Sequence, residues 1–191
     1  MKARNHVLGL LALCAIVTLF SGCASQQAPE AEKTAQPELS GYDIYENSTY
    51  GVRISYPADW EKTENFMGTP VVFLAPKECA EDRFQENLNI MTMDMSGQEA
   101  TLQEYTAASE EQIKQVVTDA QITESADTTL AGSPAHRIVF SGTQGAYKLK
   151  WMQVWTIKNK KAYGITYTAE ADKYDAYLDK VNKMIRSFET M

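Results

Sequence analysis

Cysteine and histidine are scarce in this sequence, which argues against several kinds of site. The 191 residues include three cysteines and two histidines. Beyond residue 22, the only histidine is His136 and the only cysteines are Cys23 and Cys79. A zinc site or a nucleophile–base pair usually needs more such side chains. Glycine-rich phosphate loops, a Gly-x-Ser-x-Gly turn and a His-Glu-x-x-His helix are also missing. The sequence therefore predicts neither an enzyme nor a cofactor.

Positive charge is in short supply as well. The chain carries 18 lysines and arginines against 25 aspartates and glutamates, a formal net charge of −7. An acidic surface disfavours nucleic acid and adsorption to anionic lipid. We therefore predict no nucleic-acid partner. Surface charge is also not expected to attach the protein to a membrane.

Long apolar runs are confined to the N-terminus. Lys2 and Arg4 precede an almost wholly apolar stretch from Val7 to Phe20. This stretch is shorter than the roughly 20 residues that span a bilayer. The order of positive charge, apolar core and small residues is that of a secretory signal peptide. An uncleaved anchor helix is the alternative, and we predict that residues 1–22 are a cleaved signal peptide.

The end of this stretch resembles the bacterial lipobox. Its sequence is Leu19-Phe20-Ser21-Gly22-Cys23, with Phe20 where leucine is usual. In that motif the thiol receives a diacylglyceryl group and a peptidase cuts just before it, which predicts cleavage between Gly22 and Cys23 and lipid on Cys23. Two or more acyl chains anchor a protein stably, whereas one does not. The expected location is extracytoplasmic, with the lipid in the cell membrane or the outer membrane.

Residues 23–40 follow as a lipidated N-terminus and flexible tether. They are rich in Ala, Gln, Glu, Pro and Ser, a composition that cannot bury enough apolar surface to repay ordering. Such a coil spans on the order of 20–25 Å. Residues 41–191 are long enough for one domain with its own core.

From Gly41 the sequence alternates between strand and helix patterns. Thr101 and Glu104 form a capping box, which predicts the start of a helix that ends near residues 118–119. Consecutive strands joined by short turns require antiparallel pairing, so the fold class is α+β, with helices packed on an antiparallel sheet. Period-two patterns predict strands at 42–45, 50–56, 71–74, 88–95, 122–129, 135–141, 149–157 and 162–169, and a second helix at about 172–188.

Two patterns indicate which faces are buried. Leu88 and Ile90 lie on one face of their strand and Met91, Met93 and Met95 on the other, which predicts a sheet covered on both sides. The methionines are interpreted as lining a core or an interaction surface, with soft-metal binding as the alternative. The first helix presents a buried stripe of Leu102, Tyr105, Ser109, Ile113 and Val116.

Three stretches together resemble the PsbP family, whose founding member is an extrinsic subunit of photosystem II. They are Ser55-Tyr56-Pro57-Ala58-Asp59-Trp60, Gly132-Ser133-Pro134-Ala135 and Ile185-Arg186-Ser187-Phe188. The resemblance covers nearly all of Gly41–Met191. It implies an α/β/α sandwich around a central antiparallel sheet, and an accessory or assembly role without catalysis. The manganese-side segments of the plant protein have no counterpart here, so its photosynthetic role is not carried over.

The remaining side chains that could carry chemistry each have a structural interpretation. Trp60 is expected to pack in the core as opposed to forming a ligand platform. Cys79 is interpreted as a small buried or loop thiol, and His136 as the end of a strand. Trp151, Trp155, Tyr163 and Tyr167 are expected to pack between sheet and helix, with an aromatic ligand cage as the alternative.

The densest acidic loop is a weak candidate for a metal site. It contains Glu78, Glu81, Asp82 and Glu86 but lacks the order of an EF-hand, and calcium needs six to eight oxygens in defined geometry. A solvated acidic surface is the preferred interpretation.

The leading functional hypothesis is a membrane-tethered module that binds an envelope protein, and the alternative is an envelope protein that binds a small ligand or a divalent cation such as calcium. An enzyme using Cys79 or His136 is the third possibility.

Overall fold

The computed structural model describes residues 40–98 and 100–191. The predicted signal peptide, Cys23 and nearly all of the tether lie outside these residues. Within them, no helix has both the length and the apolar character needed to cross a membrane. The elements in chain order are β1 (Tyr42–Asn47), β2 (Val52–Pro57), β3 (Glu61–Phe66), β4 (Thr69–Leu74), β5 (Asn87–Asp94), α1 (Leu102–Val116), β6 (Thr118–Leu130), β7 (Ser133–Gln144), β8 (Tyr147–Lys158), β9 (Lys161–Glu170), α2 (Tyr174–Arg186) and β10 (Glu189–Thr190).

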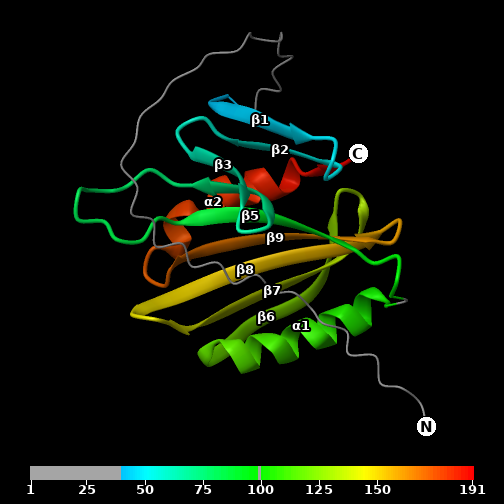
Figure 1. Cartoon of the computed structure of the whole chain (residues 1–191). Helices are drawn as coiled ribbons and strands as arrows, with labels where there is room; N and C mark the ends of the chain where they lie inside the picture. The colour runs from blue at the N-terminus through cyan, green and yellow to red at the C-terminus, as the bar shows by residue number, and fades with distance from the viewer. Residues whose placement is uncertain (1–39, 99) are drawn as a thin grey trace.

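The strands form two antiparallel sheets. Seven of them build a large sheet in the order β3-β4-β5-β9-β8-β7-β6, and β1, β2 and β10 build a small one. Every strand pair in both sheets is antiparallel. The predicted α+β class with a central antiparallel sheet is confirmed. β1 and β2, however, belong to the separate small sheet, which lies above the large one in Figure 1.

Strand β3 was absent from the sequence prediction because its composition is polar. Its residues Glu61–Phe66 are exposed or only half-buried, and they pair with β4 at the edge of the large sheet. Charged side chains on an edge strand oppose pairing with another chain. Hydrophobic periodicity carries no signal for a strand of this kind, so only the turn at Met67-Gly68, where both φ angles are positive, could have suggested a hairpin.

Helix α1 begins as predicted and ends slightly earlier. The Glu104 amide donates to Thr101 Oγ1 at 3.2 Å, and the Thr101 amide donates to Glu104 Oε2 at 2.9 Å, which completes the capping box. The chain turns extended at Val117, and β6 starts one residue later. Val116 is therefore 52% exposed while Val117 is 4% exposed. The prediction that Val116 belongs to the buried stripe was wrong because the helix ends at that residue.

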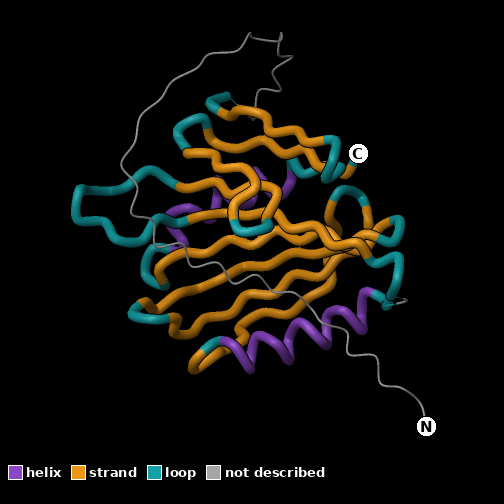
Figure 2. The backbone as a smooth tube through the Cα atoms, viewed as in Figure 1, coloured by secondary structure: helices purple, strands orange, loops and turns teal. Residues whose placement is uncertain are grey.

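The two helices lie on opposite faces of the large sheet. Alternate residues of a strand point to opposite faces, and the core divides accordingly. Ile138 and Trp151 belong to the cluster that includes Ile113 of α1, whereas Val139 and Met152 belong to the cluster that includes Val181 of α2 and the small sheet. Both faces are thus covered, as the sequence predicted. Figures 1 and 2 show α1 running along β6, and α2 lying near the small sheet.

Candidate functional site

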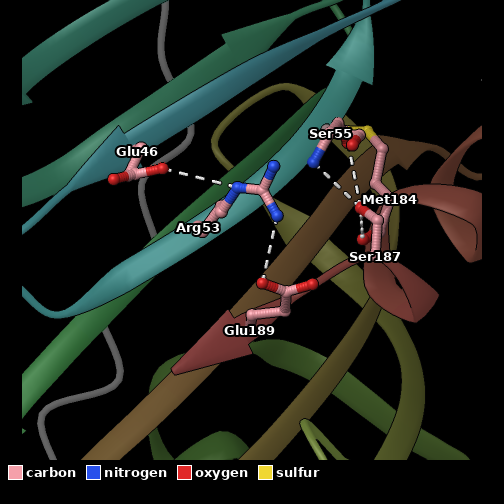
Figure 3. Close-up of polar contacts among 6 residues, drawn as sticks. All are labelled: Glu46, Arg53, Ser55, Met184, Ser187 and Glu189. Atoms are coloured by element: carbon pink, nitrogen blue, oxygen red, sulfur yellow. Dashed lines mark hydrogen bonds and ion pairs between the residues drawn. The ribbon is translucent and has the colours of Figure 1, made fainter. Parts of the chain in front are cut away.

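Two of the stretches that carry the family resemblance meet where the small sheet joins α2. The Ser55 amide donates to Ser187 Oγ at 2.9 Å, and that hydroxyl donates to the Met184 carbonyl at 2.7 Å. Figure 3 shows these contacts beside Arg53, which contacts Glu189 in β10 at 3.2 Å. Strand β10 pairs with β2 only at Val52 and Arg53, so the serine hydroxyl continues the pairing two residues further along β2. These motif residues fix α2 against the small sheet.

Trp60 supports the same junction. It is 3% exposed, lies in the core cluster with the small sheet and α2, and meets the Tyr177 ring edge-on at 6.0 Å between centroids. The prediction that Trp60 is a core residue is confirmed. Its position explains the Tyr-Pro-x-x-Trp spacing, because Pro57 ends β2 and the Trp60 amide then donates back to the Pro57 carbonyl at 2.9 Å.

The acidic loop does not gather its carboxylates. Glu78 forms an ion pair with Lys173, and Asp82 accepts hydrogen bonds from the backbone of its own loop. Glu81 is exposed, whereas Glu86 is 1% exposed, and burial raises the pKa of its carboxyl. Among residues 40–98 and 100–191, no group of three or more His, Cys, Asp or Glu side chains is placed to hold a metal ion. The geometry gives the calcium alternative no support.

Cys79 is an exposed thiol in the same loop and forms no disulfide within the described chain. The structure places it on the surface of the loop, where the sequence interpretation had allowed either a buried or a loop thiol. No shared contact links it to His136, so the two residues do not form a nucleophile–base pair.

His136 takes part in a hydrogen-bonded chain that the sequence interpretation missed. Its Nε2 lies 2.8 Å from Ser125 Oγ and its Nδ1 lies 3.0 Å from Asp127 Oδ1. These are the distances of a Ser-His-Asp triad. Ser125 also donates to Glu110 Oε1, on α1, at 2.6 Å, and the imidazole lies 5.6 Å from the Trp155 ring.

The direction of the Ser125 hydroxyl proton distinguishes a structural hydrogen-bond network from a catalytic triad. The Ser125 hydroxyl has one proton, and it is directed at Glu110. A hydroxyl that donates to Glu110 does not direct its proton at His136 Nε2, so the imidazole is not placed to activate Ser125 as a general base. In this arrangement the cluster joins α1 to β6 and β7.

The four aromatic residues proposed as an alternative cage lie on both sides of the large sheet. Trp151 and Trp155 pack in the cluster beneath α1, whereas Tyr163 and Tyr167 pack in the cluster with α2 and the small sheet. A cage needs its rings around one space. The prediction that these side chains pack between sheet and helices is confirmed.

An open pocket lies on the α1 face, over the strands that α1 does not cover. Helix α1 packs mainly on β6 and β7, and its residues Tyr105 and Ser109 line the pocket together with residues of β5, β8 and β9. The pocket has a volume of about 40 Å³. Half-buried Met91 and Met93 form one wall, Tyr105 and Trp155 another, and Gly164 lies in the floor with open space where a Cβ would be. We call these five residues the methionine pocket.

A row of polar side chains crosses the sheet at the methionine pocket, and two of them, Gln153 and Thr166, line it. Asn89, Thr166 and Gln153 are directly opposite one another on β5, β9 and β8. Gln153 lines the pocket and donates to Thr166 Oγ1 at 3.3 Å, and its Oε1 is buried without a hydrogen-bond partner in the described chain. Burial also raises the pKa of the Tyr105 phenol. Since none of the described lining residues is charged, the pocket suits an uncharged group that can donate a hydrogen bond.

Comparison with known proteins agrees with this architecture. The model of the family described as "PsbP-like protein" matches residues 7–190. This chain belongs to the PsbP-like protein family. The resemblance predicted from three short stretches is therefore confirmed over nearly the whole sequence.

Two solved structures share the fold of this PsbP-like chain. Cyanobacterial PsbP (CyanoP) from Synechocystis sp. PCC 6803 is 14% identical, with a TM-score of 0.60, over 85% of this chain and 98% of that one. LpqN from Mycobacterium tuberculosis, described as involved in cell envelope biogenesis, is 14% identical, with a TM-score of 0.58, over 73% of this chain and 83% of that one. No curated protein sequence matches significantly. At such identities the similarity concerns the fold.

Proposed function

We propose that this chain is a non-catalytic, lipid-anchored accessory module that binds a protein of the cell envelope. The lipobox ending at Cys23 supports the anchor, and membership of the PsbP-like family supports an accessory or assembly role. The description of LpqN as involved in cell envelope biogenesis favours the same compartment. Tethering raises the effective concentration of the domain near its partner.

The observation that carries the proposal is the methionine pocket. Methionine is flexible and polarisable, and it recurs on surfaces that adapt to a partner. Met91 and Met93 are half-buried around an open pocket, instead of filling a closed core as Met95 does at 2% exposure. The partner segment would be apolar with one hydrogen-bond donor, directed at the buried Gln153 Oε1.

The proposed orientation follows from where the tether meets the domain. The chain enters at Tyr42, the first residue of β1 in the small sheet. The small sheet packs on the face of the large sheet that carries Ile165 and Tyr167. The methionine pocket is on the opposite face, so a partner could reach it without displacing the small sheet.

A capture experiment with matched lysine variants tests the proposal. The lipidated chain is retrieved from detergent-solubilised envelope, and we expect co-purified proteins to be lost with Met91→Lys or Met93→Lys. Met67→Lys is the control, since Met67 is 77% exposed in the β3–β4 turn and does not line the pocket. Retention of the same proteins by all three variants would exclude this pocket as the binding surface.

The anchor is tested separately through Cys23. Mass spectrometry of the native chain should show a diacylglyceryl-modified cysteine at its N-terminus, and Cys23→Ser should release the protein from the membrane fraction. An unmodified thiol at this position would contradict the anchor while leaving the pocket experiment valid.

A further inference from the structure

A second groove lies on the opposite face of the large sheet from the methionine pocket. It runs between the β6–β7 hairpin and the C-terminal half of α2, and its volume is about 400 Å³. Small-molecule sites in proteins are typically clefts of about 300–1,000 Å³. The groove is therefore ten times larger than the methionine pocket and large enough for a small organic molecule. We call it the hairpin groove.

Two arginines line the hairpin groove from different elements. Arg137 comes from β7 and Arg186 from the last turn of α2. Arg186 is exposed and has no ion pair among the described residues. Arg137 Nε lies 3.3 Å from Glu124 Oε1, close enough for an ion pair, yet the angles leave this buried N–H without a hydrogen-bond acceptor in the described chain.

The remaining lining is neutral and divides into a polar rim and an apolar floor. Thr128 from β6 and Asn182 from α2 offer a hydroxyl and an amide group at the rim, while Met152 and Phe188 close the floor. With Glu124 beside Arg137, the charges around the groove sum to about +1 in a chain whose net charge is −7. This local reversal of sign favours an anion.

The C-terminal end of α2 would otherwise oppose an anion, because helix carbonyls there carry partial negative charge. Several of these carbonyls are already hydrogen-bonded. The Ser187 amide donates to Lys183 and Met184 at 3.1 Å, and the Phe188 amide donates to Ile185 at 3.2 Å. Arg186, an exposed lining residue in this last turn, is thus the side chain there that can offer donors to an anion in the groove.

We propose that the hairpin groove binds a small organic anion, a phosphate or carboxylate carried on a compact apolar body. The planar forks of Arg137 and Arg186 match the oxygens of such a head group. The Thr128 hydroxyl and Asn182 complete its hydrogen bonds, and the body lies over Met152 and Phe188. This site is separate from the proposed partner surface and does not depend on the lipid anchor.

Calorimetry of the purified mature chain with phenyl phosphate tests the proposal. Removing one charged donor by Arg186→Gln should weaken binding about tenfold. Lys180→Gln is the matched control, because it removes one charge from the same helix at an exposed residue that pairs with Asp59, and it should change the affinity less than about twofold. In nuclear magnetic resonance titrations, the amides of 128–132 should shift.

Inorganic phosphate and phenol separate the two parts of the ligand. If inorganic phosphate binds as tightly as phenyl phosphate, the site recognises only the head group. If inorganic phosphate binds more weakly, the apolar body contributes to binding. Absence of binding of phenyl phosphate at millimolar concentration overturns the proposal. So does binding of phenol at equal strength, or an equal loss in Arg186→Gln and Lys180→Gln.

Discussion

Replacing Ser187 by alanine tests the junction between the small sheet and α2. The hydroxyl accepts the Ser55 amide proton at 2.9 Å and donates to the Met184 carbonyl at 2.7 Å. In Ser187→Ala the Ser55 N–H loses its acceptor at a residue that is 8% exposed. The Met184 carbonyl loses the hydrogen bond from the Ser187 hydroxyl but keeps the one from the Ser187 backbone amide at 3.1 Å.

The magnitude follows from these two contacts. An unsatisfied buried donor costs about 1–3 kcal/mol, and we expect a fall of about 1–2 kcal/mol in the free energy of unfolding. For a domain of this size, that corresponds to a melting temperature lower by roughly 3–6 °C. Urea denaturation measures the first quantity, and a thermal scan by circular dichroism measures the second.

Arg53→Gln provides the comparison within the same sheet. Arg53 forms ion pairs with Glu46 at 3.4 Å and Glu189 at 3.2 Å, but all three side chains are 38–60% exposed. Exposed pairs contribute at most about 1 kcal/mol, so the arginine variant should be the less destabilised of the two. Hydrogen exchange adds a local readout, because the Ser55 amide should exchange faster in Ser187→Ala. Unchanged protection of that amide, or a larger loss in Arg53→Gln, would refute the reasoning.

Three further substitutions probe packing and buried charge. Gly142→Ala would place a Cβ 2.3 Å from Val117 Cγ1 and 2.7 Å from the Thr118 carbonyl oxygen, so urea denaturation should show a loss of about 1–3 kcal/mol; a neutral result would mean that the α1–β6 connection moves freely. Trp60→Ala removes a core indole and should cost about 3–5 kcal/mol in the same assay, and a loss below about 1 kcal/mol would contradict its core role. Burial raises the pKa of Glu86, so its stabilising contribution is present at low pH and lost as pH rises through that pKa. Glu86→Gln should therefore be more stable than the natural chain near pH 7, with the difference vanishing near about pH 4, and a pH-independent difference would refute the assignment.

The fold was largely predictable because most of its strands bury one face. Period-two patterns such as Leu149–Ile157 and 162–169 fall within β8 and β9 as the structure defines them. The strands that the sequence prediction missed have one physical cause in common. The alternating sequence pattern arises from burial of one face of a strand, and not from strand formation itself. β3 is a polar edge strand, and β10 has only two residues. The assignment of β1 and β2 to a separate sheet depends on long-range packing that periodicity does not encode.

The cluster around His136 was predictable in principle from strand register. Ala131 and Gly132 both have positive φ and form the turn, which pairs Leu130 with Ser133. Counting back along both strands then places Asp127 opposite His136. The sequence prediction ended one strand at residue 129 and began the next at residue 135, which left this register undefined. The contact from Glu110 could not have been predicted in the same way, because it depends on how α1 packs across the strands.

Two side chains of the types most associated with chemistry, His136 and Glu86, are held within the packed domain. His136 lies against Trp155 and is bonded on both ring nitrogens, and Glu86 is buried under the loop that was the metal candidate. Each helix covers only part of its face of the seven-stranded sheet, and the uncovered parts lie over different strands on the two faces. Over β5 and β9 the open part is neutral and lined by methionine, and beside the β6–β7 hairpin it is cationic. A broad sheet with two short helices thus leaves two surfaces of different character, one suited to the proposed protein partner and the other to the proposed small anion.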